Sequence, residues 1–80
     1  MTNPRMLALD EAVCRAGGIV AFSRAIGVSH QAVNGGWRRR GYVPLSRAVE
    51  IERLWGIRVE RLVREDVAQA LLDLSKLDAA

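Results

Sequence analysis

The sequence predicts a small all-α domain, and two observations support this prediction. Half of the 80 residues are hydrophobic but only four are aromatic, so the core must be built mainly from Leu, Val, Ile and Ala. Glycine and proline divide the chain into short pieces, within which apolar residues recur at helical spacing. A chain of this length allows one domain, near the lower size limit for independent folding.

The first two helices are expected at residues 7–16 and 18–26. In each segment, apolar residues three or four positions apart mark one face. Gly17-Gly18 should end the first helix and Gly27 the second, because glycine adopts the left-handed conformation of a helix C-cap without strain. Residues 19–22 are the part of these segments that could instead form a strand.

A third helix is expected to begin at Ser29, whose hydroxyl can accept a hydrogen bond from the amides that follow. The pair Gly35-Gly36 should stop this helix after barely two turns, directly before a run of three arginines. The fourth helix should run from about Leu45 to Trp55, with Gly56 as its C-cap.

The last third of the chain contains two further segments. Residues 58–64 fit either a short helix or an edge strand, and we favour the helix. From residue 67 to residue 77, Val67, Leu71 and Leu74 form part of one apolar face, opposite polar side chains. This pattern predicts a terminal helix that covers the core or meets a partner helix.

Positive charge is concentrated in the body of the chain. Residues 1–64 contain eleven Arg and five acidic residues, whereas residues 65–80 contain four acidic residues and one Lys. The planar guanidinium of Arg suits phosphate and guanine better than the ammonium of Lys does. A polyanionic partner is therefore favoured, although a genome of high GC content also enriches Arg.

Several classes of protein are disfavoured by what the sequence lacks. The single Cys14 cannot form an internal disulfide, and with a single His it argues against a zinc site. No catalytic triad and no paired carboxylates at a cleft can be recognised, so we do not expect an enzyme. The N-terminus has no signal pattern and no stretch is apolar over 18 residues. We expect a soluble cytoplasmic protein with no metal, no cofactor and no membrane partner.

Residues 19–33 fit two helices joined by a tight turn. Phe22 and Ile26 share one face, and Ser23 is small at the point where the two helices would cross. Gly27 permits the turn, and Val33 anchors the following helix. This pattern indicates a helix-turn-helix within a DNA-binding domain of residues 1–66, with residues 67–80 as a C-terminal helix for cover or dimerisation.

The outer face of the third helix would then present His30, Gln31 and Asn34. Gln and Asn side chains can make paired hydrogen bonds to adenine in the major groove. Their place near the helix N-terminus matches how a recognition helix presents its residues. The amides that follow Gly18, at the start of the second helix, could bind a DNA phosphate.

The stretch AGGIVAFSRAIGVSHQAVNGGWRRRGYVPLSRAVEIERLWG resembles the Cro and repressor type helix-turn-helix proteins of phages and prophages, in particular short YdaS-like antitoxins and Cro-like regulators. The combination of GG, RAIGVS, QAV and WRRRG carries the resemblance. It implies a compact bundle of about five helices that binds operator DNA in the major groove, usually as a dimer on a two-fold site.

By position, the resemblance implies that Gln31 and Asn34 read bases, with His30 a weaker candidate. Residues that hold the DNA backbone come from adjacent segments, as specificity and affinity together require. The predicted phosphate-binding set is Gly18, Arg24, Ser29, Arg38, Arg39 and Arg40.

The chain departs from the family pattern at one position. Family members usually place an apolar residue, often Trp, three positions after the residue that matches Val33. That position is Gly36 here, and Trp37 follows one residue late. Either the third helix unwinds at the glycines so that Trp37 still reaches the core, or a shifted loop turns the arginines differently. We expect Trp37 to pack in the core.

These features predict a sequence-specific transcriptional regulator, a Cro-like repressor of prophage origin that acts on double-stranded operator DNA as a homodimer. The alternative is a toxin–antitoxin component whose acidic segment, residues 65–80, engages a toxin or regulatory protein. A third reading is a nucleic-acid binder without sequence preference. The lack of an aromatic stacking platform argues against single strands as its target.

Overall fold

The computed structural model describes the backbone of residues 3–79 and the side chains of residues 3–77. Met1, Thr2 and Ala80, at the ends of the two predicted segments, lie outside the described residues. All regular elements in the described range are helical, which confirms the all-α prediction. They are α1 (Pro4–Ala16), α2 (Ile19–Ile26), the π-helix η1 (Ala32–Trp37), α3 (Arg38–Arg40), α4 (Leu45–Trp55), the 3₁₀-helix η2 (Val59–Arg61) and α5 (Glu65–Ala79).

The first two helices agree with the prediction except at the start of α1. The Asn3 side chain accepts a 2.9 Å hydrogen bond from the amide of Arg5, and Pro4 occupies the first helical position. This N-cap extends α1 three residues beyond the predicted start. Gly17 ends α1 with φ at 99° and Gly27 ends α2 with φ at 68°, so both predicted glycine caps are confirmed.

The third helix is longer than predicted, because Gly35 and Gly36 do not stop it. Residues 30–40 form one continuous helical segment that contains η1 and α3, and we call it the 30–40 helix. Both glycines lie inside η1 without a positive φ. The three arginines therefore occupy the last helical turn, and the chain leaves the helix only at Gly41, where φ is 84°.

Phe22 lies at the centre of the core. Its ring stacks on Trp55 with centroids 5.1 Å apart and meets Trp37 edge-on at 6.3 Å. The predicted burial of Trp37 is confirmed, with 5% of the residue exposed. Other fully buried side chains come from every part of the body: Leu9, Val33, Val43, Ile51, Ile57, Leu62 and Val63.

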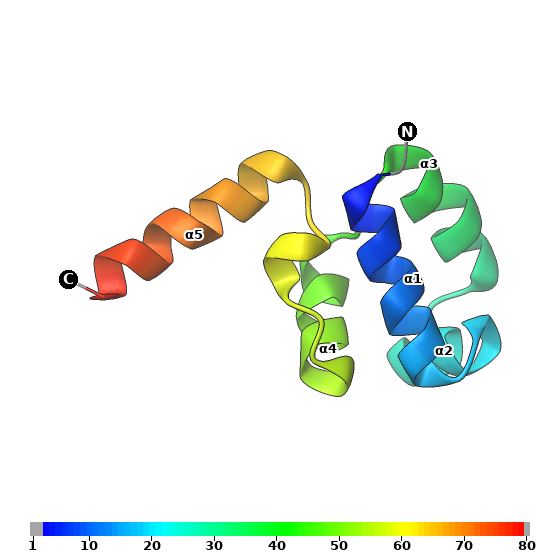
Figure 1. Cartoon of the computed structure of the whole chain (residues 1–80). Coiled ribbons are helices and arrows are strands. Elements are labelled where there is room, and N and C mark those ends of the chain that lie inside the picture. Colours follow the sequence, from blue (N-terminus) through cyan, green and yellow to red (C-terminus); the bar gives the residue numbers. More distant parts are fainter. Residues whose placement is uncertain (1–2, 80) are drawn as a thin grey trace.

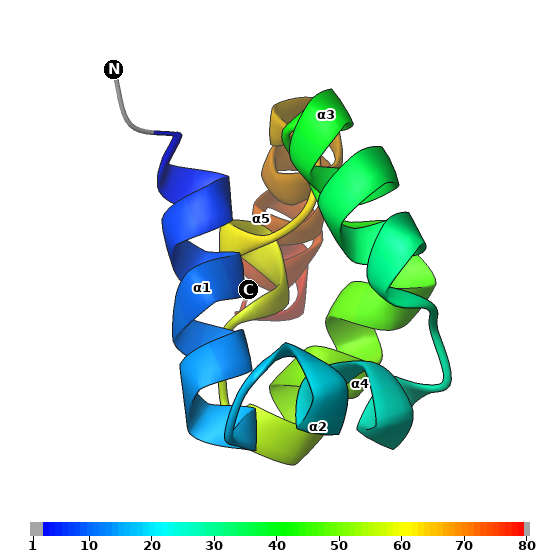
Figure 2. The same ribbon diagram turned by 90° about the vertical axis from the view of Figure 1, so that its right-hand side faces the viewer.

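Two arginines tie helix ends together across the body. Arg15 on α1 donates a 2.6 Å hydrogen bond to the carbonyl of Trp55, and Arg47 on α4 donates one of 3.0 Å to the carbonyl of Ile26. Each bond satisfies a carbonyl at a helix C-terminus, where the helix dipole also favours a cation. Together with the Phe22 contacts, these bonds hold α1, α2 and α4 around one core (Figure 2).

The segment at 58–64 is neither a full helix nor a strand. It contains only the three-residue 3₁₀-helix η2, which corrects the favoured prediction of a helix over this range. Leu62 and Val63 are buried beside it, and the Leu62 carbonyl accepts a 2.8 Å hydrogen bond from the amide of Val43. The backbone here follows the core instead of completing a regular element.

The terminal helix packs on the body only through its first turns and then projects away from it (Figure 1). Ala68 is buried, and Val67 and Leu71 pack against the core. Farther along, Leu74 is 58% exposed and Leu77 is 72% exposed. Among the helices of residues 3–79, none combines the length and the apolar character of a membrane span.

Candidate nucleic-acid interface

The 30–40 helix has one buried and one exposed side. Val33 and Trp37 on the inner side are buried in the core. His30, Gln31 and Asn34 are all exposed on the other side, as the sequence predicted. The buried pair holds the helix against the body, so the three polar side chains face solvent from a supported backbone.

The start of this helix is set by Ser29. The hydroxyl oxygen of Ser29 accepts a 3.0 Å hydrogen bond from the amide of Ala32, which is the predicted capping arrangement. The hydroxyl proton of Ser29 is left available as a donor. A phosphate at this position could accept that proton.

The π turn explains how Trp37 reaches the core one residue late. The amide of Arg38 donates to the carbonyl of Val33, five residues back, so this turn holds one residue more than an α turn. The extra residue is accommodated within the helix, which neither unwinds nor becomes a shifted loop. Gly35 and Gly36 lie in this wide turn, and a Cβ built on either would meet nothing within 4 Å.

Arg38 makes two hydrogen bonds with other side chains of the protein. Its Nη2 donates to the Asp10 carboxylate of α1 at 2.6 Å, and its Nε donates to Asn34 Oδ1 at 3.2 Å. Asn34 Oδ1 has a second lone pair and its amide nitrogen has no partner among the described residues, so Asn34 can still bind a base edge. Arg38 therefore links Asn34 to Asp10 on α1. To contact a phosphate, as predicted, Arg38 would have to leave Asp10.

The other predicted phosphate ligands differ in whether they already make hydrogen bonds or ion pairs within the protein. Arg24, Arg39 and Arg40 are exposed, and within the described residues they make no hydrogen bond or ion pair. The amide of Gly18 donates to the Val13 carbonyl at 2.9 Å and so closes the end of α1. At the start of α2, the amides that follow Gly18 are the ones left for a phosphate.

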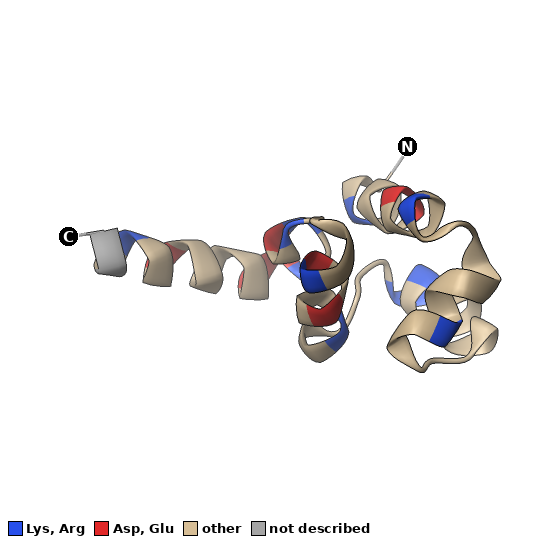
Figure 3. Ribbon diagram, turned by 90° about the horizontal axis from the view of Figure 1, so that it is seen from below, with Lys and Arg blue, Asp and Glu red and all other residues tan. Residues whose placement is uncertain are grey.

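Charge is unevenly distributed over the two halves of the body (Figure 3). Residues 3–43, which contain α1, α2 and the 30–40 helix, carry six Arg and two acidic residues. The α4 and η2 half is mixed. There, Arg58 lowers the pKa of Glu60 by a hydrogen bond, and Glu60 in turn raises the pKa of Arg58. The half that carries the 30–40 helix is the more attractive one for a polyanion.

Sequence reasoning missed two features near this surface. It did not find the Asp10–Arg38 contact, because these two residues are 28 positions apart on separate helices, and it did not predict the Arg38–Asn34 hydrogen bond within the 30–40 helix. It also did not find a pocket around Tyr42 that brings together three separate stretches of the chain, around residues 4, 41 and 65. A lone Tyr after an arginine run carries no pattern that would identify such a pocket.

Comparison with models of known protein families found no match, and comparison with curated proteins and with solved structures found none either. The resemblance to Cro-type regulators accordingly stays a prediction from the residues quoted above.

Proposed function

We propose that this protein is a sequence-specific DNA-binding transcriptional regulator that inserts the 30–40 helix into the major groove. α2, the short turn at residues 27–29 and the 30–40 helix act as a helix-turn-helix. The observation that carries the proposal is the two-sided character of the 30–40 helix: a buried inner side and an outer side of His30, Gln31 and Asn34.

Base reading follows from the chemistry of these side chains. Asn34 and Gln31 can each accept from adenine N6 and donate to N7, a paired contact worth about 1–3 kcal/mol of discrimination. Asn34 is the better held of the two, because Arg38 bonds its Oδ1. His30 at the helix start contributes a single contact and is the weaker reader.

Backbone contacts come from the exposed arginines. Arg39 and Arg40 at the end of the 30–40 helix and Arg24 on α2 bind phosphates, and Ser29 donates its hydroxyl proton to another. Each neutralised phosphate contributes about −0.9 to the slope of log affinity against log salt. Binding is therefore strongly salt dependent.

The regulator acts as a homodimer in this proposal. One short helix reads too few bases for useful specificity, and two copies on a two-fold site double the contacts. The exposed Leu74 and Leu77 of α5 are available to a second copy. Equilibrium sedimentation should show a dimer at tens of micromolar, free or on DNA; a monomer in both conditions would contradict this part.

The test is fluorescence anisotropy with labelled DNA from immediately upstream of the gene, a shuffled duplex as control, and a salt series. We expect a preference of about a thousandfold or more for the native fragment. Replacing Gln31 and Asn34 with Ala should remove most of this preference, whereas Gln69→Ala on α5 serves as a matched control. Equal binding of both duplexes by the wild-type protein would refute sequence-specific reading.

A second candidate function is a toxin–antitoxin component that acts through protein contacts. The exposed apolar residues of α5 favour it, because a helix that leaves Leu72, Leu74 and Leu77 in solvent is suited to a protein partner. Copurification of a stoichiometric partner, lost in a Leu74→Asp, Leu77→Asp variant, would support this function. Absence of DNA binding in the anisotropy assay would favour it further.

A further inference from the structure

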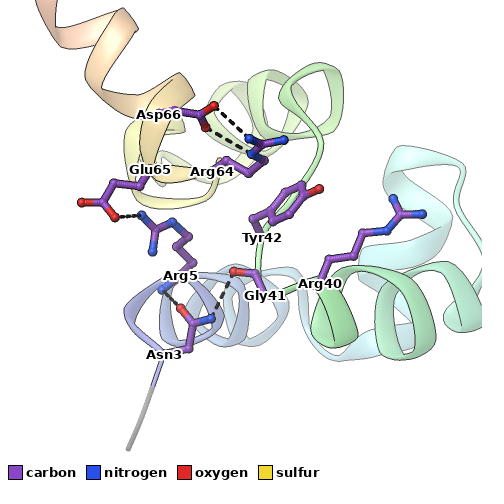
Figure 4. A pocket seen from close by; sticks show the side chains of 8 residues that line it. All are labelled: Asn3, Arg5, Arg40, Gly41, Tyr42, Arg64, Glu65 and Asp66. Carbon is purple, nitrogen blue, oxygen red and sulfur yellow. Dashed lines mark hydrogen bonds and ion pairs between the residues drawn. The ribbon is translucent and has the colours of Figure 1, made fainter.

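An open pocket of about 390 Å³ lies where the start of α1, the end of α3 and the start of α5 meet (Figure 4). It adjoins the end of the 30–40 helix. Its charged and aromatic lining comprises three arginines, one tyrosine and two carboxylates: Arg5, Arg40, Arg64, Tyr42, Glu65 and Asp66.

Two of the arginines are held in place by the protein. Arg5 donates from Nε to the Val63 carbonyl at 2.8 Å. Arg64 binds Asp66 through two hydrogen bonds of 3.1 and 2.9 Å, and its guanidinium carbon lies 5.8 Å from the centre of the Tyr42 ring. These contacts restrict the side chains that would otherwise lose conformational freedom on binding a ligand.

The pocket keeps an excess of positive charge. Its three arginines face two carboxylates, and Arg40 has no ionic partner among the described residues. In the view of Figure 4 the Tyr42 ring lies between the Arg64 and Arg40 side chains, and the Arg64 guanidinium lies over that ring. Asn3 Nδ2 donates to the Gly41 carbonyl at 3.1 Å, which occupies an oxygen that would otherwise repel an anion.

We propose that this pocket binds one phosphate of the DNA backbone, just beyond the bases that the 30–40 helix reads. Arg40 and Arg64 provide the charge and Tyr42 donates a hydrogen bond to a phosphate oxygen. A phosphodiester suits the pocket because it offers several acceptor oxygens to two guanidinium groups. This inference rests on the proposed DNA-binding function and extends its contacts to residues outside the arginine run.

Asp66 acts as the internal competitor of that phosphate. In the free protein its carboxylate occupies Nε and Nη2 of Arg64. On DNA, a phosphate oxygen replaces the Asp66 carboxylate at one of these two nitrogens of Arg64. Because the carboxylate opposes this exchange, replacing Asp66 with Asn should strengthen binding to any duplex.

The experiment compares Arg64→Ala with Arg58→Ala in the anisotropy salt series. The two arginines are closely matched, since each is exposed and each pairs with a carboxylate two residues later, Glu60 or Asp66. Arg58 does not line the pocket. Thermal melting of both variants and of Asp66→Asn confirms that each is folded at the assay temperature.

If the pocket binds a phosphate, Arg64→Ala lowers the magnitude of the log–log salt slope by about 0.9 while Arg58→Ala leaves it unchanged. The native and shuffled duplexes should weaken by the same factor, because a backbone contact carries no sequence information. Tyr42→Phe, which removes the phenol donor but keeps the ring, should weaken binding without changing the slope.

Equal slopes for the Arg64 and Arg58 variants, with DNA binding by the wild-type protein intact, would overturn the pocket alone. A wild-type protein that binds neither duplex would overturn the pocket and the proposed function together. Weakening confined to the native duplex would also contradict the proposal, because it would make Arg64 a base-reading residue.

Discussion

Replacing Gly35 and Gly36 with Ala should stabilise this protein. Both glycines have helical backbone without a positive φ, and a Cβ at either would meet nothing within 4 Å. Glycine inside a helix costs about 0.8–1.0 kcal/mol relative to alanine, mainly through the greater freedom of the unfolded chain. Two replacements should therefore raise the free energy of unfolding by about 1–2 kcal/mol.

The assay is urea unfolding together with thermal melting, both followed by circular dichroism. For a domain of this size 1 kcal/mol corresponds to about 4–8 °C, so we expect Tm to rise by about 5–15 °C. Gly41→Ala is the control, for which we expect a change in stability in the opposite direction. Its φ is 84° and its Cβ would lie 2.8 Å from Asn3 Nδ2, so this variant should lose stability.

A loss of stability in the Gly35→Ala, Gly36→Ala variant would refute the reasoning, because it would mean that these positions are not open helical backbone. A gain raises the question of why the glycines are present. If they let the 30–40 helix approach DNA closely, the stabilised variant should bind DNA more weakly. Unchanged DNA binding would leave the glycines without a role in the interface.

Three further predictions concern single positions. Asp10→Ala removes the carboxylate that holds Arg38, so the preference for native over shuffled DNA should fall. An unchanged preference in the anisotropy assay would exclude a positioning role for Asp10. Ser23→Ala removes a buried hydroxyl that has no hydrogen-bond partner in the described structure. Chemical unfolding should therefore show a stability that is unchanged or higher by up to about 1 kcal/mol. A clear loss of stability would mean that the Ser23 hydroxyl does have a partner. Deleting Gly36 removes the extra residue of the wide turn, so the helix should continue with ordinary α-helical hydrogen bonds. The Trp37 side chain should stay buried, as tryptophan fluorescence would show. An unfolded product would argue against this account of the π turn.

The sequence predicted most of the helix boundaries because they depend on local rules. Gly17, Gly27 and Gly56 end helices wherever the chain must adopt a left-handed conformation, and Ser29 caps a helix through an amide three residues away. Apolar spacing also identified the buried side of α2. These features involve residues within about one helical turn of each other, so they can be predicted from residues that are close in the sequence.

Local rules failed where packing opposed them. Glycine pairs usually end helices, yet Gly35-Gly36 lies inside one. Burying Val33 in the core and Trp37 against Phe22 stabilises a continuous helix more than the glycines weaken it. At residues 58–64, packing also prevailed over the local helical pattern. Leu62 and Val63 reach the core from an irregular backbone, so the segment forms only one 3₁₀ turn.

By itself, the sequence determined the all-helical class, the glycine caps and which polar residues of the 30–40 helix face outward, because all three depend on local conformation and on a short repeat. Only the tertiary structure decided that Arg38 pairs with Asp10 and that Arg5, Arg40 and Arg64 share one pocket. Those contacts join residues from distant parts of the chain. They exist because the core brings the start of α1, the end of α3 and the start of α5 to one place.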